Sequence, residues 1–371
     1  MLKGLSRLWW RGAKRIGKAQ QSQYKKLVKG LQKSIAPTKP AHAKSAASKR
    51  PSVATSQSKS QSAENSGTRL PGKWIASYIT SLGHDVRLPA RRMHYWIYLP
   101  RSAAASALPL PMVVMLHGCE QTVSQFAQGT RMNKLAEERG FAVLYPQQSL
   151  RGNTKRCWPW YDRITQQGGG DVQLIVTVID TVIAKYPIDT TRIYIAGMSA
   201  GAAMAHILAL TRTERFAAVG LHSGPVFGGA RSSMSAYAVM QGGSVKAANN
   251  AMIGSSLQFR NIPAILIHGD ADRIVRPVNQ MQLAQQFKIL NHLSEKNSIP
   301  EVVKNANRGD AKNAPHLYRL RDYVVKKKLL LRICRVEGLG HAWSGGNCTL
   351  PYNDCAGPDA SKMMWDFFER K

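Results

Sequence analysis

The segment RIYIAGMSAGAAMAH, residues 192–206, joins an apolar strand pattern to a helix-forming run rich in alanine. At the junction it contains the pattern G-x-S-x-G, with Ser199 between Gly197 and Gly201. Glycines at these two positions let the strand and the helix pass closely, so the turn can lift the serine hydroxyl out of the sheet. The adjacent helix N-terminus favours developing negative charge. We therefore predict that Ser199 is a nucleophile; the alternative is a glycine-rich helix start without chemistry.

Short apolar runs and helical patterns alternate on both sides of this segment. The predicted strands are 111–116, 141–145, 192–196, 264–267 and 329–336, and the predicted helices are 124–139, 171–185, 200–211, 278–291 and 359–370. Strand followed by helix, repeated, implies right-handed crossovers and a mostly parallel sheet with helices on both faces. We also expect one or two antiparallel strands within 85–100 and irregular insertions at 226–260 and 294–314. The predicted fold class is therefore α/β.

A serine nucleophile needs a base, and the base needs a carboxylate that orients it. When the serine lies in such a strand–turn–helix, these partners follow it in the order acid, then histidine. Asp270 and Asp272 both follow the strand 264–267. We favour Asp272 as the acid because apolar residues directly after it would pack the loop down, and Asp270 remains the alternative. The predicted general base is His341, in a glycine-flanked loop after the last strand.

Ester or amide chemistry at a serine also needs two backbone N–H groups aimed at the developing oxyanion. One is expected from Ala200, directly after the predicted nucleophile. The other is expected from Cys119, in the loop after the strand 111–116. In this interpretation the Cys119 side chain is not itself the catalyst.

Four aromatic residues are the candidate substrate-binding residues. Trp158, Trp160 and Tyr161 lie in a loop after the strand 141–145, and Trp343 comes two residues after the predicted base. Aromatic side chains there can line an apolar channel or stack on a sugar ring. The alternative is a hydrophobic cap over the core of the domain.

Five cysteines leave at least one thiol unpaired in any intramolecular pairing. Cys119 and Cys157 lie in or next to predicted active-site loops, and Cys348 and Cys355 are seven residues apart in one loop. Both pairs are therefore candidates for a disulfide, whereas we expect Cys334, in a predicted core strand, to be a buried thiol. Two disulfides suit an oxidising compartment. Spacings typical of metal ligands are absent from the sequence.

Positive charge dominates the composition and is concentrated at one end. The 371 residues include 52 Lys+Arg against 21 Asp+Glu, for a formal net charge of +31. Residues 1–69 hold 16 of these basic residues and one acid, Glu64, a net of +15. Such an imbalance indicates an anionic partner. No apolar run approaches the roughly 18–20 residues that a transmembrane helix needs, so none is expected.

The composition divides the chain into three parts. Residues 1–36 have the pattern of a basic amphipathic helix, with Trp9 and Trp10 suited to an interface between water and an apolar surface. Residues 37–69 are rich in Ser, Ala and Lys and are expected to be a disordered linker. Residues 70–371 are the expected α/β domain.

The basic segment at residues 1–35 is expected to bind an anionic granule or phospholipid surface. The alternatives are a cleaved secretion signal, a solvated tail, or a segment that binds nucleic acid. Clustered Lys and Arg are enough for phosphate contacts, but the sequence contains no nucleic-acid-binding motif of a known fold.

Six short segments occur together in a recognisable order. They are LHGCEQ at 116–121, CWPWY at 157–161, AGMSAGA at 196–202, HGDAD at 268–272, GHAWSGG at 340–346 and GPDAS at 357–361. In these segments residues 85–371 resemble the polyhydroxybutyrate depolymerase family of esterases, which also contains acetylxylan- and feruloyl-esterase-like members. The resemblance implies an α/β-hydrolase fold and a Ser–Asp–His esterase that forms an acyl-enzyme at Ser199. It also implies that no metal or organic cofactor takes part.

The resemblance favours a serine esterase acting on poly(3-hydroxybutyrate) or related short-chain hydroxyalkanoate esters. A carbohydrate-acyl esterase of the acetylxylan or feruloyl type is the alternative enzyme. From another class, the chain could be a granule- or nucleic-acid-binding scaffold with an incidental hydrolase domain.

Three departures from the family pattern bear on location. The chain has a basic tail where many members have a signal peptide, it stops ten residues after Ser361 without a separate substrate-binding domain, and it carries a long basic segment at 294–328. Together they favour a cytoplasmic, granule-associated enzyme, with secretion as the alternative. The sequence does not address the oligomeric state.

Overall fold

The computed structural model describes residues 70–81, 91–104, 108–249, 261–306 and 314–371. Leu70–Lys371 form one compact unit. The amphipathic helix expected at 1–36 and the linker expected at 37–69 lie outside the described residues. No helix in the described part of the chain is long and apolar enough to cross a membrane.

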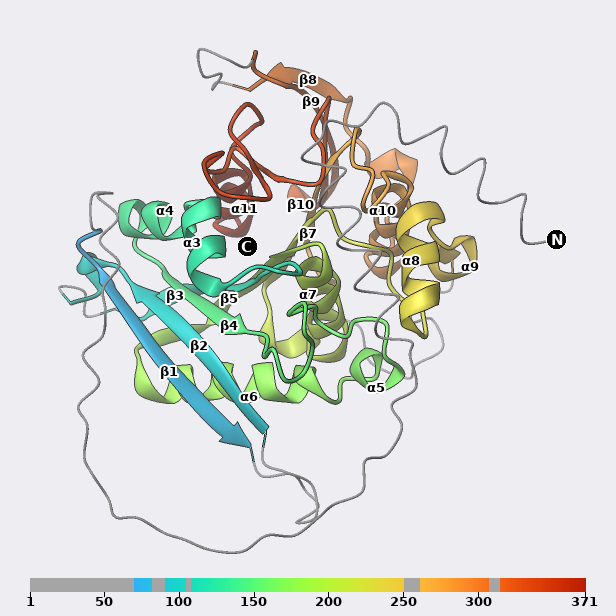
Figure 1. Ribbon diagram of the computed structural model, residues 1–371. Helices are drawn as coiled ribbons and strands as arrows, with labels where there is room; N and C mark the ends of the chain where they lie inside the picture. Colours follow the sequence, from blue (N-terminus) through green and yellow to red (C-terminus); the bar gives the residue numbers. More distant parts are fainter. Residues whose placement is uncertain (1–69, 82–90, 105–107, 250–260, 307–313) are drawn as a thin grey trace, which may run out of the picture. The chain divides into compact units, whose positions relative to one another are not determined.

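A sheet of ten strands, counted over the described residues, forms the centre of this unit (Figure 1), in the order β1-β2-β4-β3-β5-β6-β7-β10-β9-β8. The strands are β1 (Lys73–Ser81), β2 (Arg91–Leu99), β3 (Leu110–Leu116), β4 (Ala142–Gln147), β5 (Ile188–Met198), β6 (Ala218–His222), β7 (Ala264–Gly269), β8 (Val302–Asn305), β9 (Leu317–Val325) and β10 (Lys328–Val336). The six neighbouring strands β4, β3, β5, β6, β7 and β10 run parallel. β1 and β2 at one margin, and β9 and β8 at the other, pair antiparallel. The C-terminal ends of the parallel strands therefore meet at one edge of the sheet.

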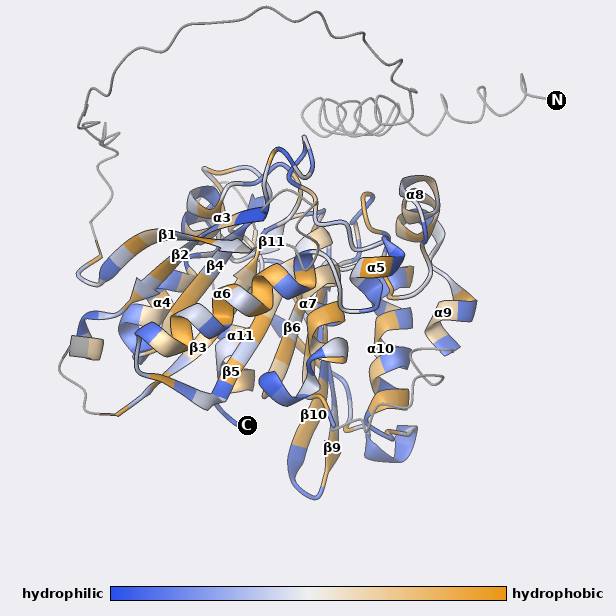
Figure 2. Cartoon of the chain, turned by 90° about the horizontal axis from the view of Figure 1, so that it is seen from below, coloured by the Kyte–Doolittle hydropathy of each residue, from blue (hydrophilic) through white to orange (hydrophobic). Residues whose placement is uncertain are grey.

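Helices cover both faces of the sheet and enclose two apolar cores. One core contains α6 (Asp171–Lys185), α7 (Ala200–Thr211) and α10 (Val278–Leu290), and the other contains α3 (Val123–Thr130), α4 (Met132–Arg139) and α11 (Ala360–Phe368). In β3, Met112 and Val114 belong to the first core and Val113 and Met115 to the second, as the two-residue period of a strand requires. Figure 2 shows the central strands in mostly apolar colours, as expected for strands that are buried on both faces.

Within the described residues, the structure contains every strand and helix that the sequence predicts, with one helix divided. The predicted helix at 124–139 is two helices, α3 and α4, because Arg131 adopts a left-handed conformation (φ 57°) between them. The two segments that were expected to be irregular insertions contain regular secondary structure, which corrects that expectation. The described part of 226–260 contains α8 (Ser233–Gly242) and α9 (Val245–Asn249), and 294–314 contains the edge strand β8.

Four strands of the sheet were not predicted: β1, β6, β8 and β9. β6 is only five residues long and contains Gly220, where an added Cβ would lie 2.9 Å from the sulfur of Met364 in α11. That glycine lets α11 pack directly on the strand, and it also weakens the strand pattern in the sequence. β1 begins twelve residues before the predicted start of the antiparallel strands at residue 85.

Candidate active site

Ser199 lies at the junction of β5 and α7, in a conformation that side chains rarely adopt. Its φ is 56° and its ψ is −121°, and a bulky or β-branched residue would be strained there. The glycines on either side are explained by backbone contacts. A Cβ on Gly197 would lie 2.4 Å from the carbonyl oxygen of Gly201, and a Cβ on Gly201 would lie 2.0 Å from that of Leu116 in β3. The close crossing of strand and helix thus depends on both glycines.

Replacing Gly201 with alanine is expected to lower the free energy of unfolding by more than about 2 kcal/mol, because the new Cβ meets a backbone carbonyl that cannot rotate away. Chemical denaturation measures this change. Gly242→Ala is the matched control, since nothing lies within 4 Å of a Cβ added there. A stability of Gly201→Ala equal to that of Gly242→Ala would contradict the close crossing.

Asp272 and His341 meet at the edge where the parallel strands end. His341 Nδ1 lies 2.7 Å from Asp272 Oδ2, and the other carboxylate oxygen accepts hydrogen bonds from the N–H groups of Ile274 and Val275, both at 2.9 Å. Asp270, the competing carboxylate, instead accepts a hydrogen bond from the backbone N–H of Gly338 at 2.8 Å. Of the two candidates, the structure therefore brings Asp272 to the histidine.

The environment of Asp272 favours its charged form. Burial alone would raise the pKa of this carboxyl, but the charge of His341 and hydrogen bonds from His268 and His341 hold the pKa well below its usual range. A carboxylate that stays ionised keeps the proton of His341 on Nδ1. The other ring nitrogen, Nε2, is then available to accept a proton.

His222 connects the serine to the loop that follows His341. Its carbonyl oxygen accepts a hydrogen bond from Ser199 N–H at 2.9 Å, and its Nε2 accepts one from Ser344 N–H at 3.1 Å. Burial, with the nearby His268 and His341, lowers the pKa of His222 to about 3, so the ring is neutral and can accept at Nε2. His222 thus binds both the backbone of the predicted nucleophile and the loop that follows the predicted base.

The loop after β3 lies against Ser199. A Cβ on Gly118 would be 3.5 Å from the Cβ of Ser199, and Gly118 N–H donates to the side-chain oxygen of Gln121 at 2.7 Å. His117 Nδ1 lies 2.7 Å from the carbonyl oxygen of Gly118. This arrangement places Cys119 directly after the glycine that contacts the serine. Ala200 is the first residue of α7, where an N–H has no acceptor within its own helix.

Several contacts fix this loop in place. Cys119 is joined to Cys157 by a disulfide, and Glu120 pairs with Lys155 Nζ at 2.6 Å and accepts a hydrogen bond from Tyr352 at 2.8 Å. Tyr352 belongs to the segment that the second disulfide, Cys348–Cys355, closes. The remaining cysteine, Cys334 in β10, is a buried thiol whose pKa burial raises. Three loops at the edge of the sheet are therefore braced against one another.

The expectation that the aromatic residues line a substrate channel is corrected for the three tryptophans. Trp158 is fully buried and donates from Nε1 to the carbonyl oxygen of His117 at 2.9 Å. Trp343 is 1% exposed and stacks on His222, with the ring centroids 4.9 Å apart. Trp160 is 5% exposed, and only Tyr161 of the four keeps appreciable accessible surface. The tryptophans support the loops from inside the core, in agreement with the alternative of a hydrophobic cap.

The sequence did not single out His117 as a residue of the site. His117 Nε2 accepts a hydrogen bond from the backbone N–H of Gln148 at 3.1 Å and lies 2.9 Å from Gln147 Nε2. Burial lowers its pKa to about 4, so the ring is neutral and Nδ1 carries the proton donated to Gly118. Its position directly after a buried strand was the available signal.

Acid is expected to destabilise the protein because buried histidines must remain neutral. Burial lowers the pKa of His117 to about 4 and that of His206 and His222 to about 3, against about 6.5 in an unfolded chain. Between about pH 6.5 and 4 the unfolded state therefore binds more protons, and stability falls as the pH falls. Thermal unfolding from pH 7 to 5 measures the slope.

His206 offers the sharpest test of this effect. Neither of its ring nitrogens has a hydrogen-bond partner within the described residues, and its ring stacks on Phe287 at 4.8 Å. His206→Phe keeps a stacked ring and removes the titration, so its loss of stability per pH unit should be smaller by up to about 1.4 kcal/mol. An identical pH dependence in the variant and the wild type would contradict this explanation.

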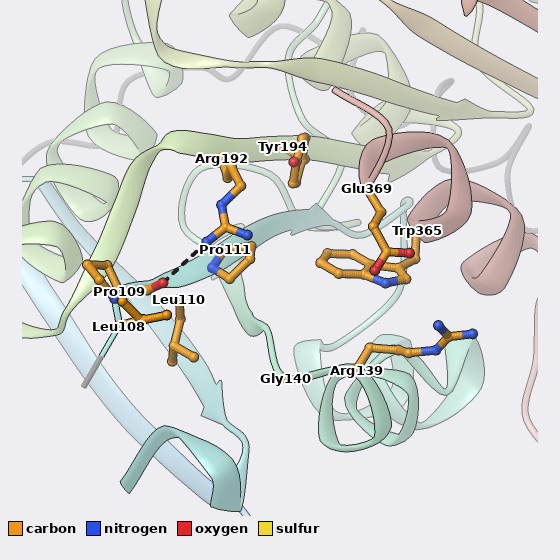
Figure 3. A pocket seen from close by; sticks show the side chains of 10 residues that line it. All are labelled: Leu108, Pro109, Leu110, Pro111, Arg139, Gly140, Arg192, Tyr194, Trp365 and Glu369. Atoms are coloured by element: carbon orange, nitrogen blue, oxygen red, sulfur yellow. Dashed lines mark hydrogen bonds between the residues drawn. The ribbon is translucent and has the colours of Figure 1, made fainter. Parts of the chain in front are cut away.

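A separate pocket of about 230 Å³ lies at the opposite edge of the sheet (Figure 3). It is lined by Pro109 and Pro111 at the start of β3, by Arg192 of β5, by Arg139 at the end of α4 and by Trp365 of α11. Arg192 is seven residues before Ser199, a distance of roughly 23 Å along a strand. The pocket therefore does not belong to the candidate active site.

Comparison with known proteins agrees with the fold. The structure of acetyl xylan esterase from Aspergillus awamori superposes with a TM-score of 0.61 at 21% identity, covering 80% of this chain and all of that one. The chain has the α/β-hydrolase fold. The family model described as Esterase PHB depolymerase matches residues 93–301. The chain belongs to this family.

Curated relatives match over part of their length. Poly(3-hydroxyalkanoate) depolymerase C of Paucimonas lemoignei is 32% identical over 213 residues, 56% of this chain and 50% of that protein. Acetylxylan esterase A of Talaromyces purpureogenus is 28% identical over 209 residues, 52% of each. The chain spans about half the length of the curated relatives it matches.

Proposed function

We propose that the chain hydrolyses ester bonds of poly(3-hydroxybutyrate) or related short-chain hydroxyalkanoates, with Ser199 as nucleophile, His341 as general base and Asp272 as the acid that orients it. The observation that carries the chemistry is the 2.7 Å contact between His341 Nδ1 and Asp272 Oδ2, on the same edge as the strained Ser199. The similarity to poly(3-hydroxyalkanoate) depolymerase C supports the choice of substrate.

In the first half of the reaction, Ser199 Oγ attacks the ester carbonyl carbon while His341 Nε2 takes the hydroxyl proton. The carbonyl oxygen becomes an oxyanion, which the N–H groups of Cys119 and Ala200 stabilise. When the tetrahedral intermediate collapses, the bond to the alcohol oxygen breaks and His341 returns the proton to that oxygen. The alcohol end of the polymer leaves, and the acyl group remains on Ser199.

Water completes the second half by the same route. His341 Nε2 accepts a proton from water as the water oxygen attacks the acyl carbon, and the oxyanion forms again in the same place. Collapse breaks the bond to Ser199 Oγ, which recovers its proton from His341. The hydroxy acid is released, and the ionised Asp272 stabilises the positive imidazolium in both halves.

A second candidate is a carbohydrate-acyl esterase, because several similar proteins are described as acetylxylan esterases. The two functions are separated by incubating the purified protein with amorphous polyhydroxybutyrate granules and with acetylated xylan, using Ser199→Ala as the blank. Clearing of the granule suspension with release of 3-hydroxybutyrate is the expected result. Release of acetate from xylan without clearing would select the second candidate.

For the N-terminal part we propose that residues 1–35 bind an anionic granule or phospholipid surface and place the enzyme on cytoplasmic granules. Deleting residues 1–69 is expected to leave hydrolysis of a soluble ester unchanged and to reduce sedimentation with phospholipid-coated granules at low salt. Loss of soluble-ester activity in the deletion would contradict this two-part organisation. Undiminished sedimentation would show that the tail has another role.

A further inference from the structure

One face of the β1–β2 ribbon presents a row of aromatic side chains to solvent. Alternate residues of paired strands point to the same face. In the antiparallel register, Ala76 pairs with Trp96, Tyr78 with His94 and Thr80 with Arg92. Trp74 pairs with Tyr98, which is buried. We call the rest of this face the aromatic face, and it consists of Trp74, Ala76, Tyr78, Thr80, Arg92, His94 and Trp96. Trp74 is 39% exposed and Tyr78 53%, His94 is also exposed, and Trp96 is half-buried.

The rings of Tyr78, His94 and Trp96 lie next to one another in a row on this face. Tyr78 and His94 have ring centroids 5.7 Å apart, and His94 and Trp96 are 6.5 Å apart. The guanidinium of Arg92 lies 4.5 Å from the centre of the Tyr78 ring, and Trp74 packs edge-on against Tyr145 of β4 at 5.5 Å. The rings are therefore held in place without being covered, and exposed apolar patches of this kind mark binding surfaces.

The opposite face of the same ribbon shows that the exposure is one-sided. Its residues Ile79, Met93, Tyr95 and Ile97 are all less than 10% exposed and belong to the core that contains α6. In Figure 1, α6 runs along this side of β1 and β2 at the margin of the sheet. α6 therefore supports the ribbon from the side opposite the aromatic face.

The aromatic face reaches the edge of the sheet that carries the candidate active site. His94 pairs with Gln147 at the end of β4, and Gln147 Nε2 lies 2.9 Å from His117 Nε2, in the loop that carries Cys119. Between β2 and β5 there are three strand spacings, roughly 15 Å. A polymer chain that crosses this edge can therefore contact the aromatic face and Ser199 at the same time.

The chemistry of the face fits a polyester. Arg92 offers hydrogen-bond donors, the rings offer apolar surface, and none of the seven residues is a carboxylate or an amide. The amide of the neighbouring Gln147 is occupied by Val123 N–H at 2.8 Å and by His117. A polyester has carbonyl acceptors for Arg92 and aliphatic groups for the rings, and it needs no acceptor from the face.

We propose that the aromatic face is a binding surface for an aliphatic polyester chain and holds the polymer next to the catalytic edge. This inference rests on the proposed function and adds to it a residue-level site for the polymer outside the catalytic residues. Short soluble esters do not reach from Ser199 to this face, so their hydrolysis does not depend on it.

Adsorption to amorphous polyhydroxybutyrate particles tests the proposal. The full chain carries Ser199→Ala, so that binding is measured without hydrolysis, and about 0.5 M salt screens the charge of the basic segment. Adding Trp74→Ala and Tyr78→Ala is expected to weaken adsorption by about tenfold or more, since two stacking rings are lost. The matched control is Val302→Ala with Val303→Ala on β8, at the other margin of the sheet, where the side chains are 43% and 50% exposed; its adsorption should equal that of the Ser199→Ala parent.

Three results would overturn the proposal. They are unchanged adsorption of the aromatic variant, an equal loss in the β8 control, and a loss of binding to insoluble acetylated xylan in place of the polyester. The two aromatic substitutions, made in the enzyme that retains Ser199, must leave soluble-ester activity unchanged, which verifies the fold. If that activity is lost, the single variant Tyr78→Ser is used in place of the double variant. If the aromatic substitutions weaken adsorption but the wild type does not clear the granules, the proposed function alone is refuted. If the wild type clears the granules and the aromatic substitutions change neither adsorption nor clearing, this inference alone is refuted.

Discussion

Ser199→Ala is expected to reduce hydrolysis of both soluble esters and polymer by about 10⁵-fold or more. The substitution removes only Oγ, the atom that forms the acyl bond in the proposed mechanism. The backbone at this position (φ 56°, ψ −121°) does not depend on the hydroxyl, because it is held by the N–H of Ser199 bonding to His222 and by the flanking glycines. Steady-state kinetics on a soluble ester, with a thermal melt to verify the fold, measure the effect.

Ser223→Ala is the matched control for this prediction. Ser223 also has a positive φ (50°) and follows the neighbouring strand β6, where its buried hydroxyl lies 3.1 Å from His222 Nδ1. Its loss should change kcat by less than about tenfold, because the hydroxyl holds a positioning histidine and does not form the acyl bond. Equal activities of the two variants would mean that Ser199 is not the nucleophile.

The second large effect is expected at the carboxylate. Asp272→Asn should lower kcat by about 10³- to 10⁴-fold while leaving KM nearly unchanged. The amide keeps the size of the side chain but lacks the charge that stabilises the imidazolium, and its NH₂ group can force His341 into the tautomer with the proton on Nε2. That tautomer cannot accept the proton of the serine.

Asp270→Asn separates this role from a general effect of the loop. The two carboxylates are two residues apart, but Asp270 accepts a hydrogen bond from Gly338 N–H, and Asp272 contacts His341. The Asp270 variant should keep kcat within about tenfold of the wild type. If Asp270→Asn showed the larger loss, the acid would be misassigned.

The parts of the fold that the sequence predicts are those with strong local signals. The strands that became β3, β4, β5, β7 and β10 are continuous apolar runs because both faces of a central strand are buried. The pattern around Ser199 was predictable for a different reason: a Cβ added to Gly197 or to Gly201 would lie 2.4 or 2.0 Å from a backbone oxygen, so both positions require glycine. A position that has no room for a Cβ must be glycine, and a glycine can be recognised in the sequence.

Other features depend on contacts between distant segments and could not be predicted. Trp158 and Trp343 look like exposed aromatic residues of a loop, yet each is buried because its Nε1 finds a partner in another loop or helix, His117 O for the first and Ser361 Oγ for the second. The role of His222 was hidden for the same reason, since its two backbone partners, Ser199 and Ser344, lie 145 residues apart in the chain. The short strand β6 contains a glycine that only the packing of α11 explains.

The central claim is that Ser199 carries a hydroxyalkanoyl group during turnover, and trapping that group tests it most directly. The full chain would be mixed briefly with amorphous polyhydroxybutyrate, quenched in acid, digested and analysed by peptide mass spectrometry. We predict a mass increase of one or more 3-hydroxybutyryl units on the peptide that contains Ser199, and no increase in the Ser199→Ala variant. The same adduct on a peptide without Ser199, or its persistence in the alanine variant, would contradict the account.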